Sequence, residues 1–253
     1  MHAVCLGVCK RLVGIYVNGG KGQKLSCKLS VGSRELINAR IKRIRPFIPN
    51  DFQRRLRGLN YLEQYKATEF RQILLYLGPY LFVDVLPKEF YDHFVYLHFA
   101  IYCLCTNETT LIDSAHACIE HFCSNLEIYN GFCSSYNFHV ILHLSEFVRK
   151  YGNLKRRIKP TRHILQHSVS QGMNLLSLPV EKSDLIISNK VPDNCFQTES
   201  GIISVQRVND DGSVTGRKFS FLKNLYDQPY PSLTLDIGSV SYTHLTLPTI
   251  YSV

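Results

Sequence analysis

The most regular apolar pattern in the chain lies between residues 65 and 79. Its apolar side chains recur at intervals of three and four residues, as they do along one face of a helix: Ala67, Phe70, Ile73, Leu74 and Leu77. We expect four polar side chains to lie largely off this face: Lys66, Glu69, Arg71 and Gln72. Gly78 and Pro79 predict the end of the helix, because glycine accepts a left-handed cap and proline cannot continue the hydrogen-bond ladder.

Further helices are predicted on either side of this one. Residues 33–45 suit a helix capped by Ser33, and the Pro-Phe-Ile-Pro run at 46–49 breaks it. Its inner face is predicted to consist of Ile37, Ile41 and Ile44. Residues 88–105 are apolar on nearly all sides, so we expect a central, buried helix there. Residues 1–17 fit either a strand followed by a short helix or one buried helix.

Two more helices are predicted before residue 152. Residues 110–129 have Thr109 or Thr110 as their cap, and their inner face is Leu111, Ala115, Cys118, Ile119, Phe122 and Leu126. The helix at 135–151 ends at Gly152, and its inner face is Phe138, Ile141, Leu142, Ser145 and Val148. Residues 33–151 are therefore predicted to form an all-helical bundle.

The pattern changes after the last predicted helix. Residues 168–200 are polar and irregular, as in a linker. Residues 201–207 and 216–222 suit two strands joined by a turn at 209–212, which predicts a β-hairpin, and residues 235–240 complete a small β-rich appendix. The predicted fold class is α+β, mainly α.

Composition narrows the class of protein. The chain has 253 residues, 45% of them hydrophobic, which is enough for a sizeable core. No window reaches the roughly 18 apolar residues of a membrane span, so we expect no membrane partner. The nine cysteines are odd in number and lack framework spacing. They predict a reducing compartment, either nucleus or cytoplasm.

The net charge of +9 is concentrated in two segments. Residues 33–57 hold eight basic and two acidic residues, and residues 149–162 hold seven basic residues and no acidic one. Such segments are typical of proteins that bind a phosphate backbone, although solubility or an acidic partner explains them equally well. The candidate nucleic-acid contacts are Arg40, Lys42, Arg43, Arg45, Arg54, Arg55, Arg57, Lys155, Arg156, Arg157, Lys159 and Arg162.

Histidines and cysteines are the candidate metal ligands of the chain. His139 and His143 stand four residues apart, a spacing that presents two nitrogens to zinc from one helix face. A glutamate between them and a third ligand are missing, so we favour structural histidines in a polar seam of the bundle. No two cysteines form a CxxC pair, which favours buried free thiols.

Three segments carry a resemblance to a known family. They are MHAVCLGVCKRLV at 1–13, YKATEFRQILLYLGP at 65–79 and YNFHVILHLSEFVRKYGNL at 136–154. Together they resemble the catalytic region of cut-and-paste DNA transposases of the CACTA (En/Spm-like) type, above all the transposase-derived proteins of invertebrate genomes. The resemblance implies an RNase H-like catalytic fold interrupted by a helical block.

The same resemblance implies phosphodiester cleavage and strand transfer by two Mg²⁺ ions held by carboxylates. His2 matches the histidine of the family's Asp-x-x-His motif, whose aspartate falls before Met1, so we expect Met1 to be an internal methionine. Leu154 joins Lys155 directly, where family members carry the glutamate that completes the metal site. Because an imidazole alone does not hold Mg²⁺, we predict no bound cofactor and no nuclease activity.

The sequence thus predicts a truncated, internally deleted relative of these transposases, with catalysis lost and non-specific DNA binding retained. Its expected segments are an RNase H-like remnant (1–32), a helical insertion bundle with the basic segments (33–167), a linker (168–200), a β-rich appendix (201–239) and a tail (240–253) that resembles a translated sequencing-library adaptor. Two alternatives stay open. One is a non-enzymatic module that binds a protein partner, and the other is a product without function.

Overall fold

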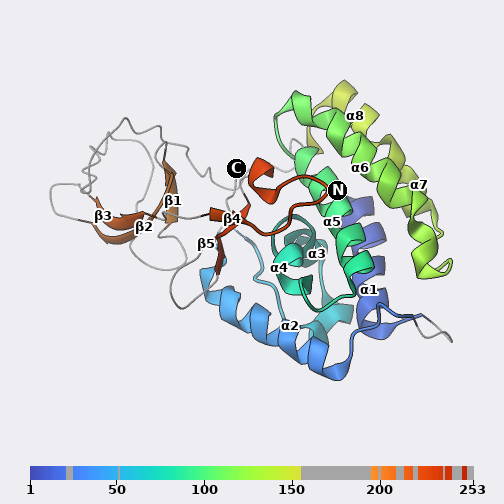
Figure 1. The fold of residues 1–253 in the computed structure, drawn as a ribbon, viewed down its shortest axis with the longest axis horizontal. Coiled ribbons are helices and arrows are strands. Elements are labelled where there is room, and N and C mark those ends of the chain that lie inside the picture. Colours follow the sequence, from blue (N-terminus) through green and yellow to red (C-terminus); the bar gives the residue numbers. More distant parts are fainter. Residues whose placement is uncertain are drawn as a thin grey trace.

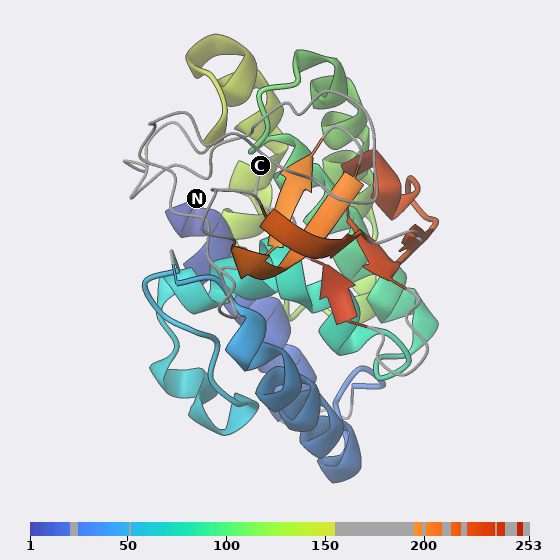
Figure 2. The same cartoon turned by 90° about the vertical axis from the view of Figure 1, so that its left-hand side faces the viewer.

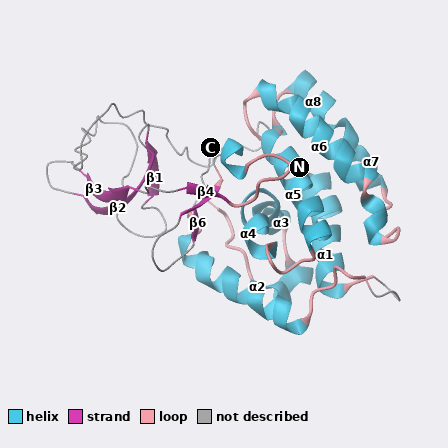
Figure 3. Cartoon of the chain, in the orientation of Figure 1, coloured by secondary structure: helices cyan, strands magenta, loops and turns pink. Residues whose placement is uncertain are grey.

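The computed structural model of the chain describes residues 1–20, 25–50, 52–154, 195–198, 201–208, 214–218, 222–235, 237–240 and 247–249. This described part is mainly helical, as predicted (Figure 3). The helices form one body, and strands β1 to β3 stand to its left in Figure 1. Figure 2 looks from that side and shows the strands in front of the helices.

The first helix consists of two parts. A π-helical stretch (Ala3–Cys9) continues directly into α1 (Lys10–Asn18), which settles the two alternatives for this segment in favour of one buried helix. Helix α2 (Val31–Ile44) runs along the outer edge of the body (Figure 1). Its cap is Ser30, whose hydroxyl accepts the Ser33 N–H at 3.0 Å, so the prediction of Ser33 as the cap is wrong.

The helix predicted at 65–79 is a composite that runs further than expected. It joins α3 (Ala67–Gln72), a π-helical turn (Ile73–Leu77) and α4 (Gly78–Phe82). The prediction that Gly78 and Pro79 end the helix is wrong. Gly78 has right-handed helical angles (φ −56°, ψ −48°), and Pro79 occupies the first turn of α4, where proline is tolerated.

Gly78 serves close packing rather than capping. A Cβ atom at this position would lie 2.4 Å from Cζ of Phe94 and 2.5 Å from the carbonyl oxygen of Ile73. Only a residue without a side chain therefore lets α4 approach α5 (Lys88–Cys103) this closely.

The remaining helices are α6 (Ile112–Ser124), α7 (Tyr136–Val140) and α8 (Leu144–Tyr151). Three 3₁₀ turns flank them, at Thr109–Leu111, Leu126–Tyr129 and Ile141–His143. Gly152 ends α8 with φ +84°, as predicted. Neither Thr109 nor Thr110 caps α6, because the 3₁₀ turn before it begins after Glu108 without a side-chain cap.

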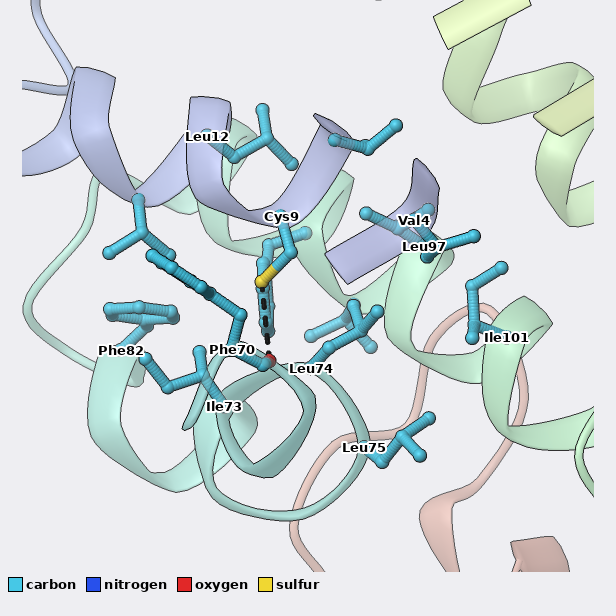
Figure 4. Packing of buried hydrophobic residues seen from close by; sticks show 14 of the residues in the cluster. Val4, Cys9, Leu12, Phe70, Ile73, Leu74, Leu75, Phe82, Leu97 and Ile101 are labelled. Atoms are coloured by element: carbon cyan, nitrogen blue, oxygen red, sulfur yellow. Dashed lines mark hydrogen bonds between the residues drawn. The ribbon is translucent and has the colours of Figure 1, made fainter. Parts of the chain in front are cut away.

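One hydrophobic core joins these helices. Figure 4 shows Val4, Cys9 and Leu12 of the first helix packed on Phe70 and its neighbours, with α5 behind them. Most residues of the inner faces predicted from periodicity are buried: Ile37, Ile41 and Ile44 on α2, Ala115, Cys118, Ile119 and Phe122 on α6, and Phe138, Ile141, Ser145 and Val148 around α8. Leu111, Leu126 and Leu142, predicted on the same faces, are partly buried and pack against the core. Helix α5 is buried along most of its length, as its uniformly apolar sequence predicted.

The strands form two small antiparallel sheets. The first has the order β1 (Cys195–Thr198), β2 (Gly201–Val208), β3 (Val214–Lys218), and its β2–β3 pairing confirms the predicted hairpin. The prediction of a linker up to residue 200 is wrong at its end, because β1 pairs with β2 there. The second has the order β4 (Leu222–Asn224), β5 (Gly238–Val240), β6 (Leu247–Thr249). Strand β6 lies within the segment expected to be adaptor-derived.

The chain between β4 and β5 packs on α5. The ring of Tyr230 stacks on Phe99 with 4.8 Å between centroids, and Tyr226 meets His98 edge-on at 5.5 Å. Tyr226, Leu235 and Ile237 belong to the same hydrophobic core as the helices. The β4–β5 segment is therefore part of the helical body.

Candidate nucleic-acid interface

Exposed basic residues gather where α2 ends. Lys42 and Arg43 occupy its last turn, and Arg45 begins the 3₁₀ turn Arg45–Phe47; all three side chains are exposed. The negative end of a helix dipole stabilises cations at such a position. These residues therefore have a local structural reason to be basic in addition to any ligand.

Arg54 and Arg55 lie in the connector that leads from α2 towards α3. Arg54 is exposed, whereas Arg55 is half-buried and donates to Oδ1 of Asn50 at 2.7 Å. Gln72 fixes the connector: its side-chain oxygen accepts the Leu56 N–H at 3.0 Å, and its amide donates to the carbonyl of Arg54. Gln72 is buried beneath the connector, which its predicted place off the apolar face did not indicate.

The Arg57 guanidinium forms hydrogen bonds with acceptor groups of the same chain. Its Nε and Nη2 donate to the two carboxylate oxygens of Glu69 at 2.7 and 2.8 Å, and Nη2 also donates to the carbonyl of Gln64 at 2.8 Å. Glu69 is fully buried, which its predicted place off the apolar face did not indicate. Its burial is possible because this ion pair and the Lys66 N–H at 2.9 Å satisfy its carboxylate. Burial by itself raises the pKa of Glu69, but the bonds from Arg57 and Lys66 outweigh it and hold that pKa below its usual value.

Arg40 also has internal partners. Its Nη1 donates to three carbonyl oxygens at the end of α4, those of Tyr80 at 2.9 Å, Leu81 at 3.0 Å and Val83 at 2.7 Å. Its guanidinium lies 5.5 Å from the centre of the Tyr80 ring. The carbonyls at the end of a helix lack partners within it, so Arg40 acts as a cap for α4 from a neighbouring helix.

Five further predicted contacts and His2 complete the candidate residues. Lys155, Arg156, Arg157, Lys159 and Arg162 lie outside the described residues. His2 is exposed at the start of the first helix and makes no capping hydrogen bond there. Within the described chain, the exposed basic set near the end of α2 is Lys42, Arg43, Arg45 and Arg54.

His139 and His143 lie on the surface. Both side chains are exposed, and their rings meet edge to face with 5.2 Å between centroids. The prediction that they sit in a polar seam of the bundle is wrong, because Phe138, Ile141 and Ser145 supply the inner face instead. Among the described residues, no three His, Cys, Asp or Glu side chains are grouped as metal ligands would be.

Two histidines on α5, His93 and His98, are buried, although the sequence did not mark them as candidate site residues. The Nε2 of His93 lies 2.8 Å from the Phe122 carbonyl, so it carries the proton, and Nδ1 accepts from the hydroxyl of Tyr129 at 3.1 Å. Because the Tyr129 proton is thereby used, the Tyr16 hydroxyl, 2.9 Å away, donates to Tyr129. Burial lowers the pKa of His93 to about 4, which keeps this chain of hydrogen bonds neutral.

The eight cysteines from Cys5 to Cys133 are free, as predicted. Seven of them are buried and Cys123 is half-buried. Burial raises the pKa of the Cys118 and Cys133 thiols to about 12. A thiol that stays protonated at neutral pH is a poor nucleophile.

No known protein family, curated protein or solved structure matches this chain. The resemblance to CACTA transposases therefore stays a prediction carried by the three motifs. Within the described residues, no helix has both the length and the apolar character needed to cross a bilayer.

Proposed function

We propose that this protein is a transposase-derived, non-catalytic DNA-binding protein that contacts the phosphate backbone without reading sequence. In this proposal residues 1–32 descend from an RNase H-like core, and the helices after them descend from its insertion bundle. The segment that holds the family's Mg²⁺-binding glutamate is missing between Leu154 and Lys155, which supports the loss of cleavage.

The observation that carries the proposal is the exposed cationic group Lys42, Arg43, Arg45 and Arg54. We call these four residues the α2 basic patch. Exposed lysine and arginine side chains bind phosphates by displacing condensed counterions, which gives affinity without sequence specificity. Arg40 and Arg57 form hydrogen bonds within the chain, so the α2 basic patch contains fewer residues than the set of contacts predicted from the sequence.

The test is a salt series of binding to a short fluorescent DNA duplex between about 50 and 200 mM salt. We compare the full chain with the variant K42Q/R43Q/R45Q/R54Q. If all four side chains contact phosphates, the slope of log K against log salt becomes shallower by about 3.6 in the variant.

A second variant, K10Q/K28Q/K66Q/K88Q, removes the same charge from exposed lysines elsewhere on the surface. This control shows whether the change in slope comes from losing the α2 basic patch or from lowering the net charge of the protein. Equal slopes for the two variants would refute the α2 basic patch as the binding site. Absence of salt-dependent binding by the unmodified chain would refute the proposed function and leave the protein-interaction alternative.

A further inference from the structure

The chain between β4 and β5 lies across α5 as a strap. We use this name for the described residues of the range 222–240, which form the red segment beside α5 in Figure 1. The Tyr230 ring stacks on Phe99 of α5 with 4.8 Å between centroids, and Tyr226 meets His98 edge-on at 5.5 Å. The strap thus covers the part of α5 that carries His98 and Phe99, and both side chains are fully buried.

The hydrogen bonds that shape the strap join its own residues. The Leu225 N–H donates to the hydroxyl of Ser232 at 2.7 Å, and the Ser232 N–H donates to the Tyr226 carbonyl at 2.9 Å. The Ile237 N–H donates to the carbonyl of Ser232 at 3.1 Å. Breaking these bonds leaves the hydrogen-bond ladders of the helices intact. A local unit of this kind can open while the rest of the protein stays folded.

Two polar groups are buried without partners where the strap meets α5. His98 donates its Nδ1–H to the Leu74 carbonyl at 2.7 Å, and its Nε2 has no hydrogen-bond partner among the described residues. The Tyr226 hydroxyl is likewise buried without a partner in the described part of the chain. A buried polar atom without a partner loses the hydrogen bond that water would give it. Opening of the strap returns both groups to water, which lowers the cost of opening.

Protonation of His98 strengthens this effect. A proton added at Nε2 turns the ring into a cation with two donors, and the second donor has no acceptor among the described residues. Burying an unpaired charge costs far more than burying a neutral polar atom, whereas water solvates the same cation once the strap is open. Burial accordingly lowers the pKa of His98 from its ordinary value of 6.5 to about 4, although the bond to Leu74 opposes this shift.

The ionisable groups that face His98 do not titrate in the same range. Tyr102 on α5 and Tyr226 on the strap lie 6.1 and 5.5 Å from its ring centre, and burial raises the pKa of Tyr226. Cys103 and Cys118 lie near Tyr226, and burial raises the pKa of both thiols. All four groups are therefore neutral in acid. On the π-helical turn, the group that meets His98 is the backbone carbonyl of Leu74.

The charged residues of the described strap point into solvent. Lys223 and Asp227 are both exposed, and Oδ1 of Asp227 accepts a hydrogen bond from the Asn224 amide at 2.8 Å. Asp236 lies outside the described residues. His98 is thus the buried group at this junction whose charge changes between neutral and mildly acidic pH.

We propose that the strap is an acid-released cover of α5, with His98 as its sensor. When His98 takes up a proton, the strap detaches and uncovers the surface around Phe99. The open state binds the proton more tightly than the closed state, so closure is fully favoured above pH 6.5 and is weakened as the pH falls towards 4. The inference does not depend on DNA binding by the α2 basic patch.

Hydrogen–deuterium exchange of the full chain tests this proposal. The amides of Leu225, Ser232 and Ile237 report on the strap, because so short a segment does not keep its hydrogen bonds in water once released. The amides of α6 serve as the reference for global unfolding. After correction for intrinsic exchange, protection of the strap should be lower than that of α6. It should fall roughly twentyfold from pH 7 to about pH 5, as expected for one proton that binds with a pKa of 6.5 in the open state and about 4 in the closed state.

H98N and H93N are matched variants at the two buried histidines of α5. Asparagine keeps an N–H near the position of Nδ1, so H98N still supplies a donor for the Leu74 carbonyl but does not titrate. Protection of its strap should change by less than about twofold between the two pH values. H93N removes the histidine that bonds the Phe122 carbonyl on α6 and should keep the full change.

A second measurement does not require H98N to fold. Y226A removes the ring that meets His98, so the pKa of His98, followed by NMR, should rise from about 4 towards 6.5 while that of His93 stays near 4. A thermal melt of Y226A checks that the helical body is intact. An unchanged pKa of His98 in this variant would overturn the inference.

The exchange experiment can overturn it as well. Protection of the strap that does not change with pH, or that changes equally in H98N and the unmodified chain, would exclude His98 as the sensor. Equal protection of the strap and α6 at both pH values would show that the strap opens only when the whole protein unfolds. DNA binding is measured separately, so either proposal can fail while the other stands.

Discussion

The Nδ1–H of His98 donates to the backbone carbonyl oxygen of Leu74 across 2.7 Å in the middle of the core. The π-helical turn explains why this carbonyl needs a partner. The Gly78 N–H bonds to Ile73 five residues back, and the next nitrogen in that register belongs to Pro79, which has no proton. His98 thus supplies the hydrogen bond that the sequence of the helix cannot provide.

This arrangement predicts coupling between His98 and Pro79. H98L should cost about 2 to 4 kcal/mol of unfolding free energy, since it leaves the Leu74 carbonyl buried without a donor. P79A restores an N–H in the register of that carbonyl, so H98L/P79A should be more stable than the sum of the single changes implies. A double-mutant cycle from urea unfolding measures the coupling, and strict additivity would contradict it.

Acid should destabilise the protein below neutral pH. Burial lowers the pKa of both His93 and His98 to about 4, from an ordinary value of 6.5. Because the folded-state pKa is depressed, the stability is fully present above pH 6.5 and is lost as the pH falls towards 4, by up to roughly 3 kcal/mol for each histidine. His121 is the ionisable neighbour that lowers the pKa of His93 further.

Urea unfolding at pH 7 and near pH 4.5 measures this loss. The Nε2 of His98 is buried without a partner among the described residues, so its protonation would bury an unpaired charge. H98L removes one of the two titrating groups and should therefore show about half of the pH dependence. Unchanged stability of the parent chain between the two pH values would contradict the assignment.

The Arg57–Glu69 ion pair should contribute to stability more than a surface pair does. E69Q keeps the shape of the side chain but removes its charge from the bidentate contact, and we expect a loss of roughly 2 kcal/mol. D92N breaks the exposed pair of Lys88 and Asp92 on α5 and should change stability by less than about 0.5 kcal/mol. Similar melting temperatures for the two variants would contradict this ranking.

Arg40 should affect folding and leave DNA binding unchanged. R40Q takes away the donor that serves three carbonyl oxygens at the end of α4, with an expected loss of about 1 to 3 kcal/mol. R43Q, on the exposed side of the same helix, should leave the melting temperature unchanged and weaken DNA binding instead. The opposite distribution of effects would refute the division between structural and binding arginines.

Two glycines in helices should respond to alanine in opposite ways. G78A places a Cβ 2.4 Å from the ring of Phe94 and 2.5 Å from the backbone carbonyl oxygen of Ile73, so it should destabilise the protein. G14A, in the middle of α1, meets no atom within 4 Å and should stabilise by roughly 0.5 to 1 kcal/mol through helix propensity. Thermal melts of both variants under identical conditions show whether each substitution raises or lowers the melting temperature.

The sequence by itself determined the main helices and their inward faces. Ile37 and Ile41 on α2, or Phe138 and Val148 around α8, are recognisable because burial imposes a period of three to four residues on local sequence. It also determined the hairpin of β2 and β3 and the free state of the cysteines from Cys5 to Cys133. The proposed link to CACTA transposases and the predicted loss of catalysis rest on sequence alone.

Tertiary structure decided which polar residues belong to the fold. Glu69, Gln72, Arg40 and Arg57 are polar in sequence, yet each meets a partner 12 or more residues away, and periodicity carries no information about such a partner. His98 is a further example, because it donates to the Leu74 carbonyl oxygen, which Pro79 on another helix leaves without an N–H donor. Gly78 is another, because the ring of Phe94 leaves no space for a side chain there. Local sequence fixes which face of a helix is apolar, but only the packing of distant segments fixes which polar groups become buried and which stay free to bind a ligand.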